Sequence, residues 1–66
     1  MVNKELIGKE VLILVGCYQG VWGTVTEGFN FDTDVYYIIA LWNNPDLKFP
    51  YKDYDFRILG KDEVIL

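Results

Sequence analysis

The sequence predicts a small all-β domain. Its 66 residues allow one domain, residues 1–66, and 17% of them are aromatic. The aromatic residues occur together with short runs of valine and isoleucine, a composition typical of strands. No segment repeats apolar residues at helical spacing over three turns, and turn-forming residues recur at short intervals. Short strands separated by such turns favour a barrel or a small sandwich.

The predicted elements follow from alternation and from turn residues. Met1–Ile7 is a lead-in segment, at most a short strand. Glycines at both ends of the loop Gly16–Gly20 indicate backbone angles that other residues resist, and Gly23 indicates a bulge or a close backbone approach. The further predicted strands are Glu10–Val15, Val21–Glu27, Val35–Trp42 and Asp55–Leu59, with a short sixth strand left open at Glu63–Leu66. The predicted connections are a polar loop at Gly28–Asp34, a turn at Asn43–Asp46 and a 3₁₀-type turn at Tyr51–Tyr54, which Leu47–Pro50 leads into.

Composition limits the classes of function. Cys17 is the only cysteine and histidine is absent, so neither an intrachain disulfide nor a zinc site is expected. A core this small supplies only about 3–5 kcal/mol of stability. The hydrophobic content of 52% is high for a small monomer and indicates an interface.

The charge balance and the apolar runs bear on partners and on location. The net charge of −4 disfavours phosphate backbones and anionic membranes. The first residues, Met1–Glu5, lack the basic and apolar pattern of a signal peptide. The longest apolar run, Tyr36–Trp42, is far shorter than the ~20 residues that span a bilayer. With a single cysteine, these features favour the cytoplasm and no membrane contact.

The segment Gly8–Val25 resembles the KOW motif, in which valines alternate, a glycine marks the turn, and a later glycine precedes a valine by two residues. Asp55–Leu59 also looks like the short last strand of SH3-like barrels. The resemblance implies a five-stranded SH3-like barrel. The matching positions are Gly8, Val11, Ile13, Gly16, Gly20, Gly23 and Val25.

The same segment departs from the KOW pattern in its charges. In nucleic-acid-binding KOW domains, the loop between the glycines is rich in lysine and arginine. Here no basic residue lies between Lys9 and Lys48. The phosphate-contacting part of the motif is therefore not carried over, and the resemblance indicates fold more than function.

An apolar patch is the first candidate binding site. If Val11, Ile13 and Val25 face the interior, alternation places Leu12 and Leu14 on the opposite face. Together with Trp22 and Tyr18, these leucines would form a partly exposed patch of the kind that marks interfaces. The alternative is that the lead-in segment or the last strand covers this face as a second core layer.

An aromatic groove is the second candidate. Several rings lie in predicted loops or at strand ends, where related barrels bind proline-rich peptides or methylated lysine. The alternative is that these rings plug the ends of a small barrel. The groove residues are Tyr18, Trp42, Phe49, Pro50, Tyr51 and Tyr54. The two candidates together give the predicted partner-binding set: Leu12, Leu14, Tyr18, Trp22, Trp42 and Tyr51.

Chemistry-bearing residues are sparse. The Asp-x-Asp pairs at Asp32–Asp34 and Asp53–Asp55 match no EF-hand loop and are interpreted as turn residues. Cys17 has no histidine, lysine or arginine nearby to lower the pKa of its thiol, so it is not expected to act as a nucleophile. No enzyme activity and no cofactor are expected.

The favoured function is a small protein-interaction module or accessory subunit that binds through an apolar and aromatic surface, with self-association as one form of this. The main alternative is a KOW-type nucleic-acid-binding domain that uses stacking and the late basic residues Lys48, Lys52 and Arg57. A further alternative is an acidic protein that imitates nucleic acid and blocks a basic site on another protein.

Overall fold

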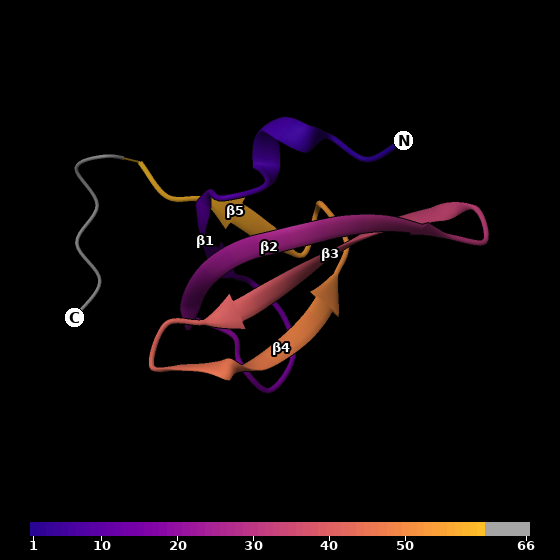
Figure 1. Ribbon diagram of the computed structural model, residues 1–66. Coiled ribbons are helices and arrows are strands. Elements are labelled where there is room, and N and C mark those ends of the chain that lie inside the picture. The colour runs from indigo at the N-terminus through magenta and orange to yellow at the C-terminus, as the bar shows by residue number, and fades with distance from the viewer. Residues whose placement is uncertain (61–66) are drawn as a thin grey trace.

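The computed structural model describes residues 1–60, which form one antiparallel sheet (Figure 1). The strand order is β4-β3-β2-β1-β5, and every neighbouring pair is antiparallel. The prediction of an all-β fold is therefore confirmed. The strands are β1 (Glu10–Ile13), β2 (Trp22–Phe31), β3 (Asp34–Leu41), β4 (Asn44–Tyr51) and β5 (Phe56–Ile58).

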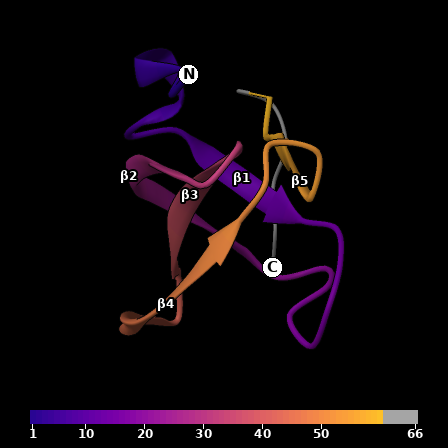
Figure 2. The same ribbon diagram turned by 90° about the vertical axis from the view of Figure 1, so that its right-hand side faces the viewer.

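The sheet is strongly twisted but is not closed by pairing among the described residues. In Figure 2, β1 and β4 run at a steep angle to one another, as right-handed strand twist produces over several strands. β4 and β5 are the two edges, and each pairs with one neighbour only. The predicted sixth strand at Glu63–Leu66 lies outside the described residues. The lead-in segment is not a strand, because Lys4–Leu6 forms a 3₁₀ turn capped by the Asn3 side chain.

The hairpin of β2 and β3 is longer than the sequence predicts. The expected polar loop at Gly28–Asp34 is wrong, since β2 runs to Phe31 and β3 begins at Asp34. Only Asp32 and Thr33 form the turn, where Asp32 takes a φ of 59° that aspartate tolerates better than most residues. Figure 1 shows the hairpin projecting beyond the rest of the sheet at this turn.

A β-bulge in β2 changes which residues face the core. Val25 pairs with Ile39, but the next pair is Glu27 with Ile38, so Thr26 is an extra residue. Before the bulge, the odd-numbered residues of β2 face the core. After it, Gly28 faces the core opposite Tyr37, and Phe29 faces outward opposite Tyr36.

The edge strand β4 contains both prolines. The predicted turn at Asn43–Asp46 is wrong, since the turn residues are Trp42 and Asn43 and β4 already begins at Asn44. Proline lacks the backbone N–H of a ladder and is therefore confined to edge strands. Pro50 nevertheless pairs with Ile38, because β4 needs hydrogen bonds on one side only.

The core lies on one face of the sheet. The expected inward positions are confirmed, since Val11, Ile13 and Val25 are 0–1% exposed. The lead-in segment covers this same face: Val2 and Leu6 pack against the core cluster, and the Asn3 backbone N–H donates to the Tyr37 hydroxyl over 2.9 Å. The buried cluster is Val11, Ile13, Val25, Tyr37, Ile39, Leu41 and Phe56.

Glycines permit the tight parts of this fold. Gly16 and Gly20 have φ values of 80° and 88°, as expected for the ends of their loop. Gly23 permits a close backbone approach, because a β-carbon there would overlap the Ala40 carbonyl oxygen. The predicted strand Glu10–Val15 is shortened to Ile13, where this loop begins.

Candidate protein-binding face

We call the side of the sheet opposite the buried cluster the outer face. Residues paired across antiparallel strands point to the same side, and alternate residues point to opposite sides. The register therefore assigns the outer face without reference to exposure. Its members are Glu10 and Leu12 of β1; Trp22, Thr24, Glu27, Phe29 and Phe31 of β2; Asp34, Tyr36, Ile38 and Ala40 of β3; Lys48 and Pro50 of β4; and Arg57 of β5.

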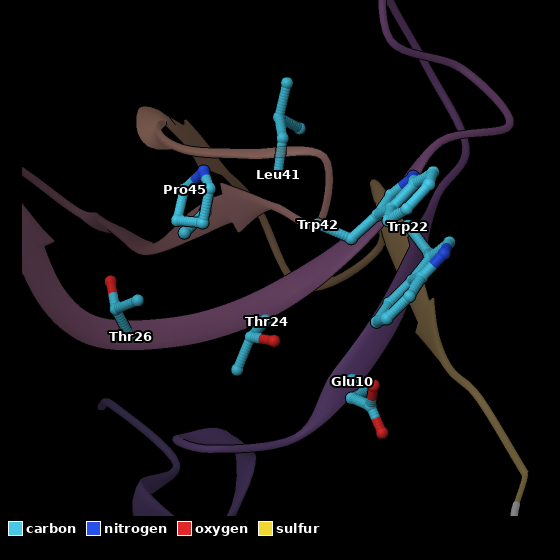
Figure 3. A pocket seen from close by; sticks show the side chains of 8 residues that line it. Glu10, Trp22, Thr24, Thr26, Leu41, Trp42 and Pro45 are labelled. Carbon is cyan, nitrogen blue, oxygen red and sulfur yellow. The ribbon is translucent and has the colours of Figure 1, made fainter.

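A groove crosses this face beside two stacked indole rings. The ring centroids of Trp22 and Trp42 lie 5.7 Å apart, and their planes are 3° from parallel. Figure 3 shows the two rings at one end of the groove, with Thr24 and Thr26 along β2 and Pro45 across from them. The groove has a volume of about 380 Å³. Trp42 is the outer ring of the pair and is 50% exposed.

The inner ring carries an unsatisfied polar group. The Trp22 indole Nε1 is buried and has no hydrogen-bond acceptor among the described residues. A buried donor without an acceptor costs about 1–3 kcal/mol. Trp22 therefore contributes to this region through the apolar contact of its ring, while its unpaired N–H lowers stability.

A second pocket lies near the hairpin turn. It has a volume of about 310 Å³ and is lined by Phe29, Phe31, Tyr36 and Pro50. The rings of Phe29 and Tyr36 stack with centroids 5.7 Å apart, and Phe31 is 63% exposed. We call this the tip pocket. Phe29, Phe31, Tyr36 and Pro50 thus form a contiguous apolar patch at this end of the outer face.

Lys52 lies close to Tyr36, one of the residues that line the tip pocket. Its Nζ lies 3.5 Å from an Asp34 carboxylate oxygen, and it lies 5.7 Å and 5.8 Å from the ring centroids of Tyr36 and Tyr54. A hydrogen bond with Tyr54 and then the charge of Asp34 raise the pKa of Lys52. The ammonium therefore stays charged and partly neutralises Asp34 at the hairpin turn.

The predicted binding residues fall into two groups. Leu12, Trp22 and Trp42 come together, since Leu12 and Trp22 are paired on the outer face and Trp22 stacks on Trp42. Leu14 lies just after β1 and is 38% exposed, with its backbone N–H bound to the Asp55 carbonyl.

Tyr18 and Tyr51 lie elsewhere. Both pack against the buried cluster, and Tyr18 stacks on Phe49 with centroids 4.9 Å apart. The predicted aromatic groove is therefore not one groove: its residues are divided between the core side, the Trp22–Trp42 groove, the tip pocket and the surroundings of Lys52.

Sequence reasoning missed the tip pocket. Phe29 and Phe31 were assigned to a loop, and Tyr36 was treated only as part of a strand. The signal that could have revealed it is alternation of aromatic residues along the two strands of the hairpin. It becomes visible once the hairpin is extended to its two-residue turn, which places Phe29, Phe31 and Tyr36 on one face.

The other candidate groups have local partners. Asp34 pairs with Lys52, and the Asp55 carboxylate accepts a hydrogen bond from the Lys52 backbone N–H. Residues 1–60 contain no group of three histidine, cysteine or acidic side chains placed to hold a metal ion. Cys17 is exposed in its loop.

Comparison with known proteins gives no relative. No protein-family model, curated protein or solved structure matches this chain. The part of the chain described by the structure has no helix with the length and apolar character needed to cross a membrane.

Proposed function

We propose that this chain is a non-catalytic protein-interaction module that binds its partner through the outer face, centred on the groove beside Trp22 and Trp42. The observation that carries the proposal is the half-exposed Trp42 ring, held flat on Trp22 at the end of a groove. Tryptophan is among the residues most enriched at positions that dominate binding energy. Such positions cluster in pockets from which water is excluded.

The floor of the groove supports this function. Thr24, Thr26 and Ala40 are small, so the space between the indole pair and Pro45 admits a partner side chain. The Thr26 hydroxyl already donates to the Ile38 carbonyl, which leaves a mostly apolar floor. Burying an apolar side chain in such a groove contributes about 1.5–3 kcal/mol.

An SH3-like, KOW-like architecture is part of the proposal. It is supported by the strand order, in which β1 lies between β2 and β5, and by the turn before β5, where the Asp55 N–H donates to the Lys52 carbonyl over 2.9 Å. The absence of histidine, and of lysine and arginine within seven positions of Cys17 in the sequence, supports a non-catalytic role. The single cysteine supports a cytoplasmic location.

The test is a selection of random peptides on the immobilised protein, followed by NMR titration of the selected peptides. We expect saturable binding that shifts both indole N–H signals. Trp42→Gln should abolish this binding. Ile58→Gln is the matched control, since Ile58 is 48% exposed and is paired with Val11, a residue of the core face.

The same samples test the alternatives. Light scattering behind size-exclusion chromatography over a wide concentration range detects self-association, which Trp42→Gln should remove if the partner is a second copy. Titration with single-stranded and double-stranded oligonucleotides tests nucleic-acid binding. Salt-sensitive oligonucleotide binding, together with peptides that shift neither indole signal, would contradict the proposed function.

A further inference from the structure

The two pockets of the outer face lie in register along β3. Ala40 lines the groove beside the tryptophans, and Tyr36 lines the tip pocket. Ala40 and Tyr36 are four positions apart on one strand, which is about 13 Å at the usual rise of a strand. Ile38 lies between them on the same face.

This spacing fits an extended peptide. In a strand, side chains at positions i, i+2 and i+4 point to the same side. An extended segment laid along β3 would therefore place residue i in the groove, residue i+4 in the tip pocket, and residue i+2 over Ile38. The two intervening side chains would point to solvent.

The charged residue beside position i+2 of the peptide, which lies over Ile38, is the acidic Glu27. Ile38 is paired with Glu27 on one side and with Pro50 on the other. Glu27 is exposed and has no basic partner among residues 1–60. A basic side chain over Ile38 would therefore lie beside a carboxylate, and neither of the described residues paired with Ile38 is basic.

The charges beside positions i and i+4 of the peptide differ from those beside position i+2. Lys48 lies beside Ala40 in the pairing of β3 with β4, and Lys52 lies 5.7 Å from the centre of the Tyr36 ring. Both signs of charge thus occur at each pocket, since Glu10 lines the groove that Ala40 also lines and Asp34 pairs with Lys52, whereas the one charged residue paired with Ile38 is Glu27. Charge complementarity therefore favours uncharged apolar side chains at i and i+4 and a cation at i+2.

We propose that the partner is an extended polypeptide segment with apolar residues at i and i+4 and arginine or lysine at i+2, bound along β3 on the outer face. This inference rests on the proposed function and specifies the class of partner. It requires both pockets and Glu27 to act on one ligand.

The test uses three capped peptides with two phenylalanines four positions apart. The first has the core Phe-Ser-Arg-Ser-Phe, the second replaces Arg by Glu, and the third moves Arg to give Phe-Arg-Ser-Ser-Phe. Dissociation constants come from NMR titration at two salt concentrations. We expect the first peptide to bind about two- to fivefold more tightly than the others, the range of an exposed ion pair, and the difference to shrink in high salt.

Charge-reversal variants of the protein complete the design. Glu27→Lys should remove the preference for the first peptide and favour the glutamate peptide. Glu5→Lys is the matched control, because it changes the net charge equally but lies in the 3₁₀ turn at Lys4–Leu6. Phe31→Ser should weaken all peptides that use the tip pocket.

The outcomes separate this inference from the proposed function. If the three peptides bind equally, or if Glu5→Lys changes the preference as much as Glu27→Lys does, the inference is wrong. If none binds at millimolar concentration, the inference is also wrong. In each case the proposed function stands when selected peptides of another pattern still require Trp42.

Discussion

The Trp42 indole lies flat on the Trp22 indole, with 5.7 Å between ring centroids and 3° between ring planes. The pair is formed by the first residue of β2 and the residue after β3, which the antiparallel register brings together: the Trp42 N–H donates to the Trp22 carbonyl over 3.2 Å. The backbone of the hairpin thus holds the two rings in position.

Trp42→Gln should lower the free energy of unfolding by about 1 kcal/mol, since stacked aromatic pairs contribute about 0.5–1.5 kcal/mol beyond their buried area. Urea denaturation measures this change. In Trp42→Phe, fluorescence from Trp22 should resist quenching by acrylamide, because the phenyl ring still covers it. Strong quenching in that variant would mean that Trp22 is open to solvent.

Gly23→Ala should destabilise the protein by about 1–3 kcal/mol, the usual cost of forcing an extra methyl group into a packed core. The added β-carbon would overlap the Ala40 carbonyl oxygen and lie 2.8 Å from Ile39 Cγ2. Thermal denaturation followed by circular dichroism measures the loss. Gly8→Asn is the control, because Gly8 has open space and a φ of 91° at which asparagine is less strained than most residues. Equal melting temperatures for Gly23→Ala and the parent would contradict the close approach of β2 and β3.

Phe31→Ser should change stability by no more than about 0.5 kcal/mol, as is usual for an exposed position. Phe31 is 63% exposed and contributes to the tip pocket rather than to the core. The variant should be more soluble than the parent at equal ionic strength. A large fall in the urea midpoint would show that the outer end of the hairpin depends on this ring.

Stability should fall above about pH 10. The pKa of Lys52 is raised above its ordinary 10.5, so its contribution is complete below that value and is lost as the pH rises through the folded-state pKa. Burial, followed by the nearby Tyr18, raises the pKa of Tyr51 above its ordinary 10.0. The unfolded chain therefore releases the Tyr51 proton first, which also destabilises the folded state at high pH.

Melting temperatures between pH 8 and pH 11 test this dependence. Lys52→Arg should show a shallower alkaline decline than the parent, because the guanidinium does not titrate in this range. Lys9→Arg is the control and should behave like the parent. Identical declines for all three proteins would show that Lys52 is not coupled to folding.

Replacing both prolines of β4, as Pro45→Thr and Pro50→Thr, should promote association at high concentration. Prolines on an edge strand prevent another strand from pairing with it. Light scattering should then report a mass that rises with concentration, whereas Lys48→Thr on the same strand should have a smaller effect. A strictly monomeric double variant would mean that the edge is protected by other means.

The core was predictable because its pattern is local. Alternation within Glu10–Val15 was enough to place Val11 and Ile13 inside, and Gly16 and Gly20 were expected at positions where they have positive φ. Leu12 and Trp22 were predicted on one outer patch, and they are paired there.

The tip pocket and β4 were not predictable in this way, because long-range pairing overrides local residue preference. Asn30 and Asp32 are turn formers, yet pairing across the hairpin keeps Asn30 in β2. Pro45 and Pro50 argue against a strand, yet β4 is an edge and tolerates them. The position of a bulge, as at Thr26, also depends on the partner strand rather than on its own sequence.

Whether Thr26 is paired or bulged decides which residues of the β2–β3 hairpin face outward. If Thr26 were paired with Ile38 instead of bulged, every later residue of β2 would shift by one position, so that Gly28 and Asn30 would face outward and Phe29 would face the core side. Loss of the bulge without loss of a residue would therefore remove the tip pocket, whereas deletion of Thr26 would leave Phe29 opposite Tyr36. Alignment with a strand that lacks the extra residue needs a gap at Thr26. Without that gap, inward residues would be equated with outward ones and the tip pocket would be missed.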